Sequence, residues 1–221
     1  MTAVLVAAGS STRMGFDKLS FDLGGETVLE RSVRAFDECP EVDELVIVTG
    51  ASSENAQRAA ARCKKPVRLV KGGSTRAESA RSGVAAAHGR LVAVHDAARP
   101  FVSQSVIADT IAAAARCGAA APAVPVKDTI KTVAEDGAVT GTPDRSTLRA
   151  VQTPQVFEAD LLKAALQSAL ENEVPVTDDC SAVERLGKVV YLIDGDEENL
   201  KITTPVDLVI AEAILAEREG R

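Results

Sequence analysis

Short apolar runs alternate along the first third of the chain with segments whose apolar residues recur at helical spacing. Residues 3–8 form an unbroken apolar run, too short for a buried helix, that has the length of a strand covered on both faces. Two further runs, 45–48 and 67–70, follow segments 27–38 and 53–63, whose patterns predict helices. This alternation of strands and helices predicts a parallel sheet with right-handed crossovers.

The same alternation continues to residue 125, stops, and resumes near residue 158. The whole chain, 1–221, is therefore expected to be one α/β domain of Rossmann-like architecture, with a mostly parallel sheet sandwiched by helices. The further elements that the pattern predicts are helices over 77–87, 103–117, 158–171 and 205–219, a short helix after Thr177, and strands over 91–95, 119–125 and 189–193, the last as a core strand.

Residues 126–157 interrupt this pattern because they have no helical period. Residues 129–133 and 138–142 flank the turn sequence EDG, which predicts a β-hairpin. A hairpin outside an α/β core has exposed strand edges, and such edges are often covered by a partner. We therefore expect a protruding arm over about 127–150 that joins two copies of the chain into a homodimer.

Composition and charge limit the partners of this domain. Hydrophobic residues make up 46% of the 221 residues and aromatic residues only 3%, so the core is expected to consist mostly of Ala, Val, Leu and Ile. The net charge of −7 without a long basic run argues against nucleic-acid binding. An anionic ligand must therefore be bound by a local cluster of Arg and Lys.

The cysteines and the longest apolar stretches indicate a cytoplasmic protein. Cys39, Cys63, Cys117 and Cys180 are far apart and form no C-x-x-C pair, which predicts small buried residues in a reducing compartment rather than a zinc or redox site. No apolar stretch approaches 18 residues, so no membrane association is expected.

The loop after the first strand carries the main candidate chemistry. Gly9, Ser10 and the small residues that follow bring backbone N–H groups close to a ligand, and such donors suit phosphate oxygens. Arg13 and Lys18 add two cations. The loop matches neither G-x-G-x-x-G nor G-x-x-x-x-G-K-[ST], so a dinucleotide site and a P-loop are excluded. An ordinary strand-to-helix turn with solvated charges is the alternative for such a loop.

Two more segments follow the ends of predicted strands and should face the same crevice as the first loop. Gly73, Ser74 and Ser79 lie in the second glycine-rich loop, where backbone and hydroxyl groups suit a base and a ribose. Asp96 directly follows the strand predicted over 91–95, within the sequence HDAARPF. A hard cation held partly by phosphate oxygens takes one or two protein carboxylates, which makes Asp96 the candidate ligand of Mg²⁺ or another divalent cation.

The first loop, AAGSSTRMGFDK, resembles the A-A-G-x-x-x-R-M-x…K signature of nucleotidyltransferases that make sugar and alditol nucleotides. Together with that loop, six segments occur in an order that resembles the 2-C-methyl-D-erythritol 4-phosphate cytidylyltransferase family over almost the whole chain. The resemblance implies attack of methylerythritol phosphate on CTP, with 4-diphosphocytidyl-2-C-methyl-D-erythritol and pyrophosphate as products. The segments are HDAARPF at 95–101, PVKDTIK at 125–131, DR at 144–145, TPQVF at 153–157, TDD at 177–179 and NLKITTP at 199–205.

The resemblance also implies a role for each matching residue. Arg145 follows the hairpin, so in a homodimer it would complete the site of the other subunit. Ser74 occupies a position where the family pattern has Asp, so it is expected to act through its backbone. The implied catalytic residues are Arg13, Lys18, Asp96, Arg145 and Lys201; the implied nucleotide-binding residues are Ala7, Ala8, Gly9, Ser10, Gly73, Ser74 and Ser79; the implied acceptor-binding residues are Arg99, Thr129, Arg145, Thr153, Thr177 and Lys201.

Three other functions remain open on the sequence. A ribitol-5-phosphate cytidylyltransferase shares HD-x-x-RP and the lysine motif, although TPDR and LRAVQTPQ favour methylerythritol phosphate. A molybdopterin nucleotidyltransferase matches the first loop but neither the hairpin nor the last lysine motif. A non-catalytic nucleotide-binding module would not require all of the implied catalytic residues.

Overall fold

The computed structural model describes residues 1–9, 15–50, 52–172 and 175–220. Its centre is an eight-stranded sheet in the order β10-β5-β9-β4-β1-β2-β3, with β8 paired to β5 beside this path. Strands β1 to β4 are mutually parallel where they pair, and β10 is parallel to β5, so the predicted mostly parallel sheet is confirmed. The strands of this sheet are β1 (Thr2–Ala7), β2 (Glu44–Thr49), β3 (Val67–Lys71), β4 (Leu91–Asp96), β5 (Ala119–Pro125), β8 (Arg149–Val151), β9 (Gln155–Glu158) and β10 (Tyr191–Asp194).

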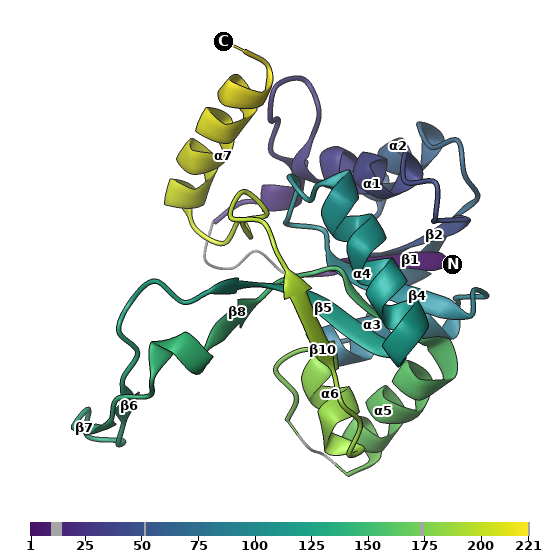
Figure 1. The fold of residues 1–221 in the computed structure, drawn as a ribbon. Coiled ribbons are helices and arrows are strands. Elements are labelled where there is room, and N and C mark those ends of the chain that lie inside the picture. The colour runs from purple at the N-terminus through teal and green to yellow at the C-terminus, as the bar shows by residue number, and fades with distance from the viewer. Residues whose placement is uncertain (10–14, 51, 173–174, 221) are drawn as a thin grey trace.

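Helices cover both faces of the sheet (Figure 1). Consecutive residues of β1 point to opposite faces, so Leu5 packs with the core on one side and Val4 with the core on the other. The first core includes residues of α1, α2, α4 and α7, and the second includes residues of α3, α5 and α6. The helices are α1 (Val28–Asp37), α2 (Glu54–Ala61), α3 (Arg76–Ala85), α4 (Gln104–Cys117), α5 (Ala159–Glu171), α6 (Asp179–Arg185) and α7 (Pro205–Arg218).

Strand β9 is the main departure from the predicted sheet. It lies between β4 and β5 and is antiparallel to both. Residues 155–157 were expected only as part of an irregular segment, and residue 158 as the start of a helix, because so short a run after Pro154 gives no period. The consequence is that Thr153, which precedes β9, is placed beside the carboxyl end of β4.

Strand β10 corrects a second expectation. It was predicted as a core strand, but it is the edge strand next to β5, and Tyr191 and Leu192 are exposed. The apolar run at 189–193 gave the element type correctly. It did not give the position in the sheet, because an edge strand and a buried strand have the same local pattern.

The predicted hairpin is present and forms a protruding arm (Figure 1). Its strands are β6 (Thr132–Val133) and β7 (Val139–Gly141), which are shorter than predicted and pair only with each other. The arm rejoins the body through β8, which is antiparallel to β5. Val133 and Val139 are 61% and 60% exposed, so the arm carries apolar side chains that the described chain leaves uncovered.

Two surface findings complete the fold. All four cysteines are free, but only Cys39 and Cys180 are buried, whereas Cys63 is half-buried and Cys117 is exposed, so the expectation of four buried thiols was wrong. Over the part of the chain that the structure describes, no helix combines the length and the apolar character needed to cross a membrane.

Candidate active site

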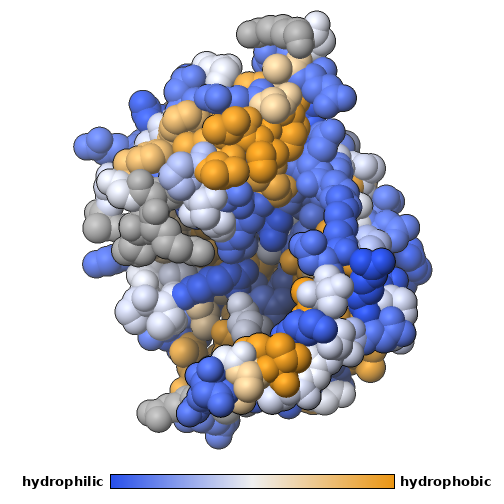
Figure 2. Space-filling model, turned by 90° about the vertical axis from the view of Figure 1, so that its left-hand side faces the viewer, coloured by the Kyte–Doolittle hydropathy of each residue, from blue (hydrophilic) through white to orange (hydrophobic). Residues whose placement is uncertain are grey.

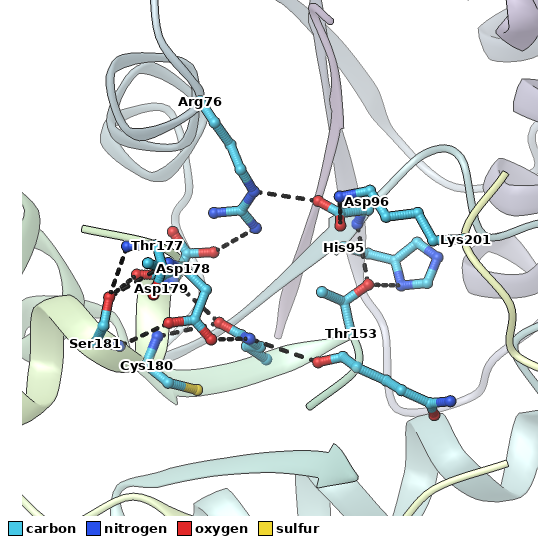
Figure 3. A network of polar contacts seen from close by, with 12 residues as sticks. Arg76, His95, Asp96, Thr153, Thr177, Asp178, Asp179, Cys180, Ser181 and Lys201 are labelled. Atoms are coloured by element: carbon cyan, nitrogen blue, oxygen red, sulfur yellow. Dashed lines mark hydrogen bonds and ion pairs between the residues drawn. The ribbon is translucent and has the colours of Figure 1, made fainter. Parts of the chain in front are cut away.

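Asp96 lies at the centre of the candidate site, as the last residue of β4 (Figure 3). Its Oδ1 is 3.2 Å from Arg76 Nε, and its Oδ2 is 2.7 Å from Lys201 Nζ. Burial alone would raise the pKa of Asp96, but the charges of Arg76, Lys201 and Arg99 outweigh burial and hold this pKa well below its usual range. The carboxyl group is therefore ionised throughout the neutral range.

Lys201 reaches Asp96 because the segment that carries it is attached to the turn after β4. The Ile202 N–H donates to the Ala98 carbonyl at 2.9 Å, and Arg99 Nη1 donates to the Asn199 carbonyl at 2.6 Å. Lys18 Nζ donates to the Ile202 carbonyl at 2.7 Å. The end of the first loop and the last lysine motif, 184 positions apart, are thus brought together.

Thr153 and His95 hold the backbone of Asp96 from the other side. The Asp96 N–H donates to Thr153 Oγ1 at 3.1 Å, and that hydroxyl is 3.1 Å from His95 Nδ1. His95 Nε2 lies 3.2 Å from the Arg99 carbonyl, which can only accept, so Nε2 carries the proton and Nδ1 accepts from Thr153. Burial lowers the pKa of His95 to about 4, which keeps the ring neutral and makes His95 structural.

The start of the first loop, at Ala8, lies beside the second loop, as the positions of the two loops after parallel strands predicted. A Cβ atom on Gly72 would be 2.6 Å from the Ala8 Cβ, so only glycine allows this approach. Ser79 is buried; its hydroxyl accepts the Gly73 N–H at 3.2 Å and donates to the Thr75 carbonyl at 2.9 Å. Ser79 therefore fixes the shape of the loop from within.

The second loop is folded onto the first turn of α3 by Glu78. The N–H and the hydroxyl of Ser74 donate to Glu78 Oε2 at 2.6 and 2.7 Å, and Thr75 completes a capping box with Glu78. These hydrogen bonds fix the second loop to the start of α3.

Arg76 and Asp179 also belong to the site, although the sequence assigned a role to neither. Arg76 Nη2 is 2.9 Å from Asp179 Oδ2, so Arg76 joins the start of α6 to Asp96 (Figure 3). Burial opposes the charged form, but the two carboxylates raise the pKa of Arg76. Two signals were visible in the sequence: a cation at the first position of α3, and the second acid of the TDD motif.

The remaining predicted residues are distributed over three places. Thr177 is exposed just before α6, and its N–H donates to Ser181 Oγ. Thr129 and Arg145 lie on the arm, where Arg145 Nη1 donates to the Lys127 carbonyl at 2.8 Å. No ion pair among the described residues joins Arg145 to Asp96. Ala7, Ala8 and Gly9 lead into the first loop, whereas Ser10 and Arg13 lie outside the described residues.

The donor set fits a cation that is bound mainly through its substrate. Within the described ranges, no three His, Cys, Asp or Glu side chains form a group that could hold a metal ion. Asp96 supplies one ionised carboxylate at the strand end, and phosphate-bound Mg²⁺ needs only one or two protein carboxylates. The residues present therefore suit a cation that arrives with a nucleotide, with Asp96 as its protein ligand.

The face at which the parallel strands end is hollowed, and hydrophilic residues line the hollow (Figure 2). Above it lies an apolar patch on α7, where Val206, Val209 and Ile210 are exposed. A small-residue loop, a second glycine loop and converging lysines at this face suit a nucleotide and an anionic acceptor. Fold and site together define an α/β protein of the nucleotidyltransferase class.

Comparison with known proteins specifies the family. The family model described as IspD, 2-C-methyl-D-erythritol 4-phosphate cytidylyltransferase, matches residues 1–217. A 2-C-methyl-D-erythritol 4-phosphate cytidylyltransferase of Symbiobacterium thermophilum is 47% identical over 221 residues, which cover 98% of this chain and 93% of the relative. The chain belongs to the 2-C-methyl-D-erythritol 4-phosphate cytidylyltransferase family.

Solved structures agree with this assignment. The 4-diphosphocytidyl-2C-methyl-D-erythritol synthase of Anaerococcus prevotii is similar with a TM-score of 0.88 and 32% identity, and the match covers 97% of each chain. The 2-C-methyl-D-erythritol 4-phosphate cytidylyltransferase of Thermus thermophilus has a TM-score of 0.80 and 36% identity, covering 96% of this chain and 97% of that one. The Rossmann-like fold predicted from the sequence is confirmed.

Proposed function

We propose that this protein transfers a cytidylyl group from CTP to 2-C-methyl-D-erythritol 4-phosphate, giving 4-diphosphocytidyl-2-C-methyl-D-erythritol and pyrophosphate. The observation that carries the proposal is the family match over residues 1–217, together with the convergence of Lys18, Asp96 and Lys201 at one strand end. The names of the relatives favour methylerythritol phosphate over ribitol 5-phosphate as the acceptor.

The reaction forms one bond and breaks one bond at the α-phosphorus of CTP. A phosphate oxygen of the acceptor attacks this phosphorus, and the bridging oxygen leaves with the β- and γ-phosphates as pyrophosphate. A phosphate monoester is largely dianionic near pH 7, so the nucleophile needs no side-chain base. The neutral, buried His95 is consistent with this, because its ring is fully engaged with Thr153 and Arg99.

Fixed cations supply what the chemistry requires. The acceptor anion must approach a triphosphate, and charge develops on the oxygens around the α-phosphorus. Lys18 contacts the Ile202 carbonyl next to Lys201, and Lys201 contacts Asp96. We assign both lysines, and Arg13 on the basis of the family motif, to the cluster that meets the two substrates. Preorganised positive charge of this kind lowers the barrier most when it is aimed at the transition state.

A divalent cation completes the proposed site. When bound, Mg²⁺ neutralises and orients the phosphates of the nucleotide. We assign Asp96 as the residue that would hold it, because its carboxyl group is ionised and stands at the carboxyl end of β4. The second loop, with Gly73 and Ser74, would bind the base and the ribose.

We further propose that the protein works as a homodimer, with Arg145 acting on the acceptor phosphate of the other subunit. Arg145 is exposed on the arm and shares no ion pair with Asp96 among the described residues. Val133 and Val139 give the arm an apolar surface for a partner to cover. Arg99, Thr153 and Thr177 would contact the acceptor beside Asp96, and Thr129 from the base of the arm. The four free cysteines support placement in the cytoplasm.

A pyrophosphate-release assay tests the proposal directly. CTP is offered with methylerythritol phosphate or ribitol 5-phosphate in separate reactions, and UTP replaces CTP in a third. We expect turnover with CTP and methylerythritol phosphate, and a large loss with UTP, because a site that hydrogen-bonds the cytosine amino group leaves buried partners unpaired with uracil. Faster turnover with ribitol 5-phosphate would identify that compound as the acceptor instead. Equal turnover with UTP and CTP would contradict the assignment as a cytidylyltransferase.

A further inference from the structure

Arg76 occupies a position that local structure disfavours. It is the first residue of α3, where the helix dipole is unfavourable for a cation. Its side chain is 29% exposed, and its guanidinium contacts two carboxylates from other elements, Asp96 and Asp179. A cation at the start of a helix, held there by strong contacts with other elements, is typical of a functional position.

Asp179 is the anchor of this arginine. Its side chain is 1% exposed, and its Oδ1 has no hydrogen-bond partner within the described part of the chain. Among the ion pairs of the described residues, Asp179 pairs only with Arg76. A buried carboxylate with one unsatisfied oxygen is costly, so the pairing holds Arg76 firmly in place.

Arg76 and Lys201 pair with different carboxylate oxygens of Asp96. Arg76 takes Oδ1 and Lys201 takes Oδ2, so neither occupies the oxygen that the other uses. When Lys201 leaves Asp96 for an acceptor phosphate, Arg76 still neutralises the buried carboxylate. Without Arg76, the departure of Lys201 would remove both ion pairs that Asp96 makes among the described residues, which would hold Lys201 back.

We propose that Arg76, anchored by Asp179, is a positioning residue that keeps Asp96 paired and thereby frees Lys201 to bind the acceptor phosphate. This inference rests on the proposed function. It assigns to the pair a role in the use of the acceptor rather than in the binding of CTP, and that distinction can be measured.

Steady-state kinetics of Arg76→Gln test the role. We expect kcat/KM for methylerythritol phosphate to fall by about 30-fold or more, the size expected when one partner of a buried charge pair is removed. KM for CTP should change by less than about 3-fold, because Lys201 is assigned to the acceptor. The matched control is Arg81→Gln, an exposed arginine of α3 that contacts Gln167 and should keep the activity of the unmodified protein.

Two further variants separate positioning from folding. Arg76→Lys restores a charge beside Asp96 and should recover at least about 5-fold of the loss. If Arg76 served only to bridge two elements through its planar guanidinium, a lysine ammonium would not replace it. Asp179→Asn should lower kcat/KM less than Arg76→Gln does, and the double variant should be no slower than Arg76→Gln, because Asp179 acts through Arg76. Thermal melting establishes that each variant is folded.

The outcomes are distinct. Arg76→Gln within about 3-fold of the unmodified protein, multiplicative losses in the double variant, or a loss confined to KM for CTP would each overturn the inference. If Arg76→Gln does not fold, Arg76→Lys and Asp179→Asn are each compared with the unmodified protein. Both should then lower kcat/KM for methylerythritol phosphate while leaving KM for CTP within about 3-fold, and a loss confined to KM for CTP would overturn the inference. No pyrophosphate from the unmodified protein with either acceptor would instead overturn the proposed function, and this inference with it.

Discussion

Lys18 is held in place by a contact that crosses the candidate site. Its Nζ donates to the Ile202 carbonyl, beside the segment that carries Lys201. Lys18→Gln should lower kcat by about 100-fold or more, as loss of a preorganised donor to the transition state does. Pyrophosphate release measures the change, and Lys163→Gln on α5 is the control. An effect on KM alone would contradict a transition-state role.

His95 should make stability depend on pH. Burial lowers its pKa from 6.5 to about 4, so between these values the unfolded chain binds a proton that the folded protein does not. Stability therefore falls as pH drops from 6.5 toward 4, by roughly 3 kcal/mol over the full range. Urea unfolding at pH 7.5 and pH 5 measures this. His95→Gln should be less stable at pH 7.5 but should lose less on acidification, and equal losses in both proteins would disprove the assignment.

At the scale of elements, the second loop depends on a close approach that only glycine permits. The missing side chain of Gly72 leaves space for the Ala8 methyl and the Ser79 hydroxyl, which a Cβ would meet at 2.6 and 2.7 Å. Gly72→Ala should push the two loops apart and raise KM for CTP by about 10-fold, at a stability cost of about 1–3 kcal/mol. Gly50→Ala is the matched control, since its Cβ would be 3.5 Å from the Ala8 carbonyl, an ordinary contact. An unchanged KM for CTP would show that the loop tolerates the shift.

Local patterns predicted most elements but not every neighbour in the sheet. The helices at 27–38 and 103–117 were predicted within about a residue, because periodicity, the Thr27 cap and Gly118 at the end of α4 are local signals. Strand β9 was missed because its place between β4 and β5 depends on pairing across some 60 positions. Arg76 and Asp179 were missed for the same reason, since their contact spans 103 positions and has no local signature. Motifs identified Asp96, Lys18 and Lys201 as candidates, and only the fold showed which residues contact them.

At the scale of the whole molecule, the proposed dimer makes a prediction about mixed subunits. Arg145 lies on the arm and Lys18 lies in the body, so a site that takes Arg145 from its partner combines residues of two chains. Mixing Arg145→Ala subunits with Lys18→Ala subunits should then restore about half of the unmodified activity in each heterodimer, because one site has both residues and the other has neither. If no activity returns, Arg145 acts within its own subunit.

The arm should also be dispensable for folding. Ala123 to Pro125 of β5 pair with Arg149 to Val151 of β8, so the arm begins and ends at neighbouring positions of the sheet. Replacing residues 128–147 with a short glycine-containing turn should leave the thermal midpoint within a few degrees, since few core contacts are lost. Size-exclusion chromatography should then report a monomer. A collapse of the thermal transition would show that the arm supports the body.

Because β5 and β8 fix both ends of the arm, the length of the hairpin can change without altering the body of the protein. Each residue added to both β6 and β7 lengthens the hairpin by about 3.3 Å and turns the side chains beyond it to the opposite face. Only additions in pairs keep Val133 and Val139 facing as they do now. Relatives that place a partner subunit nearer or farther should therefore differ in arm length by even steps on each strand, while the spacings from β4 to β5 and from β8 to β9 stay the same.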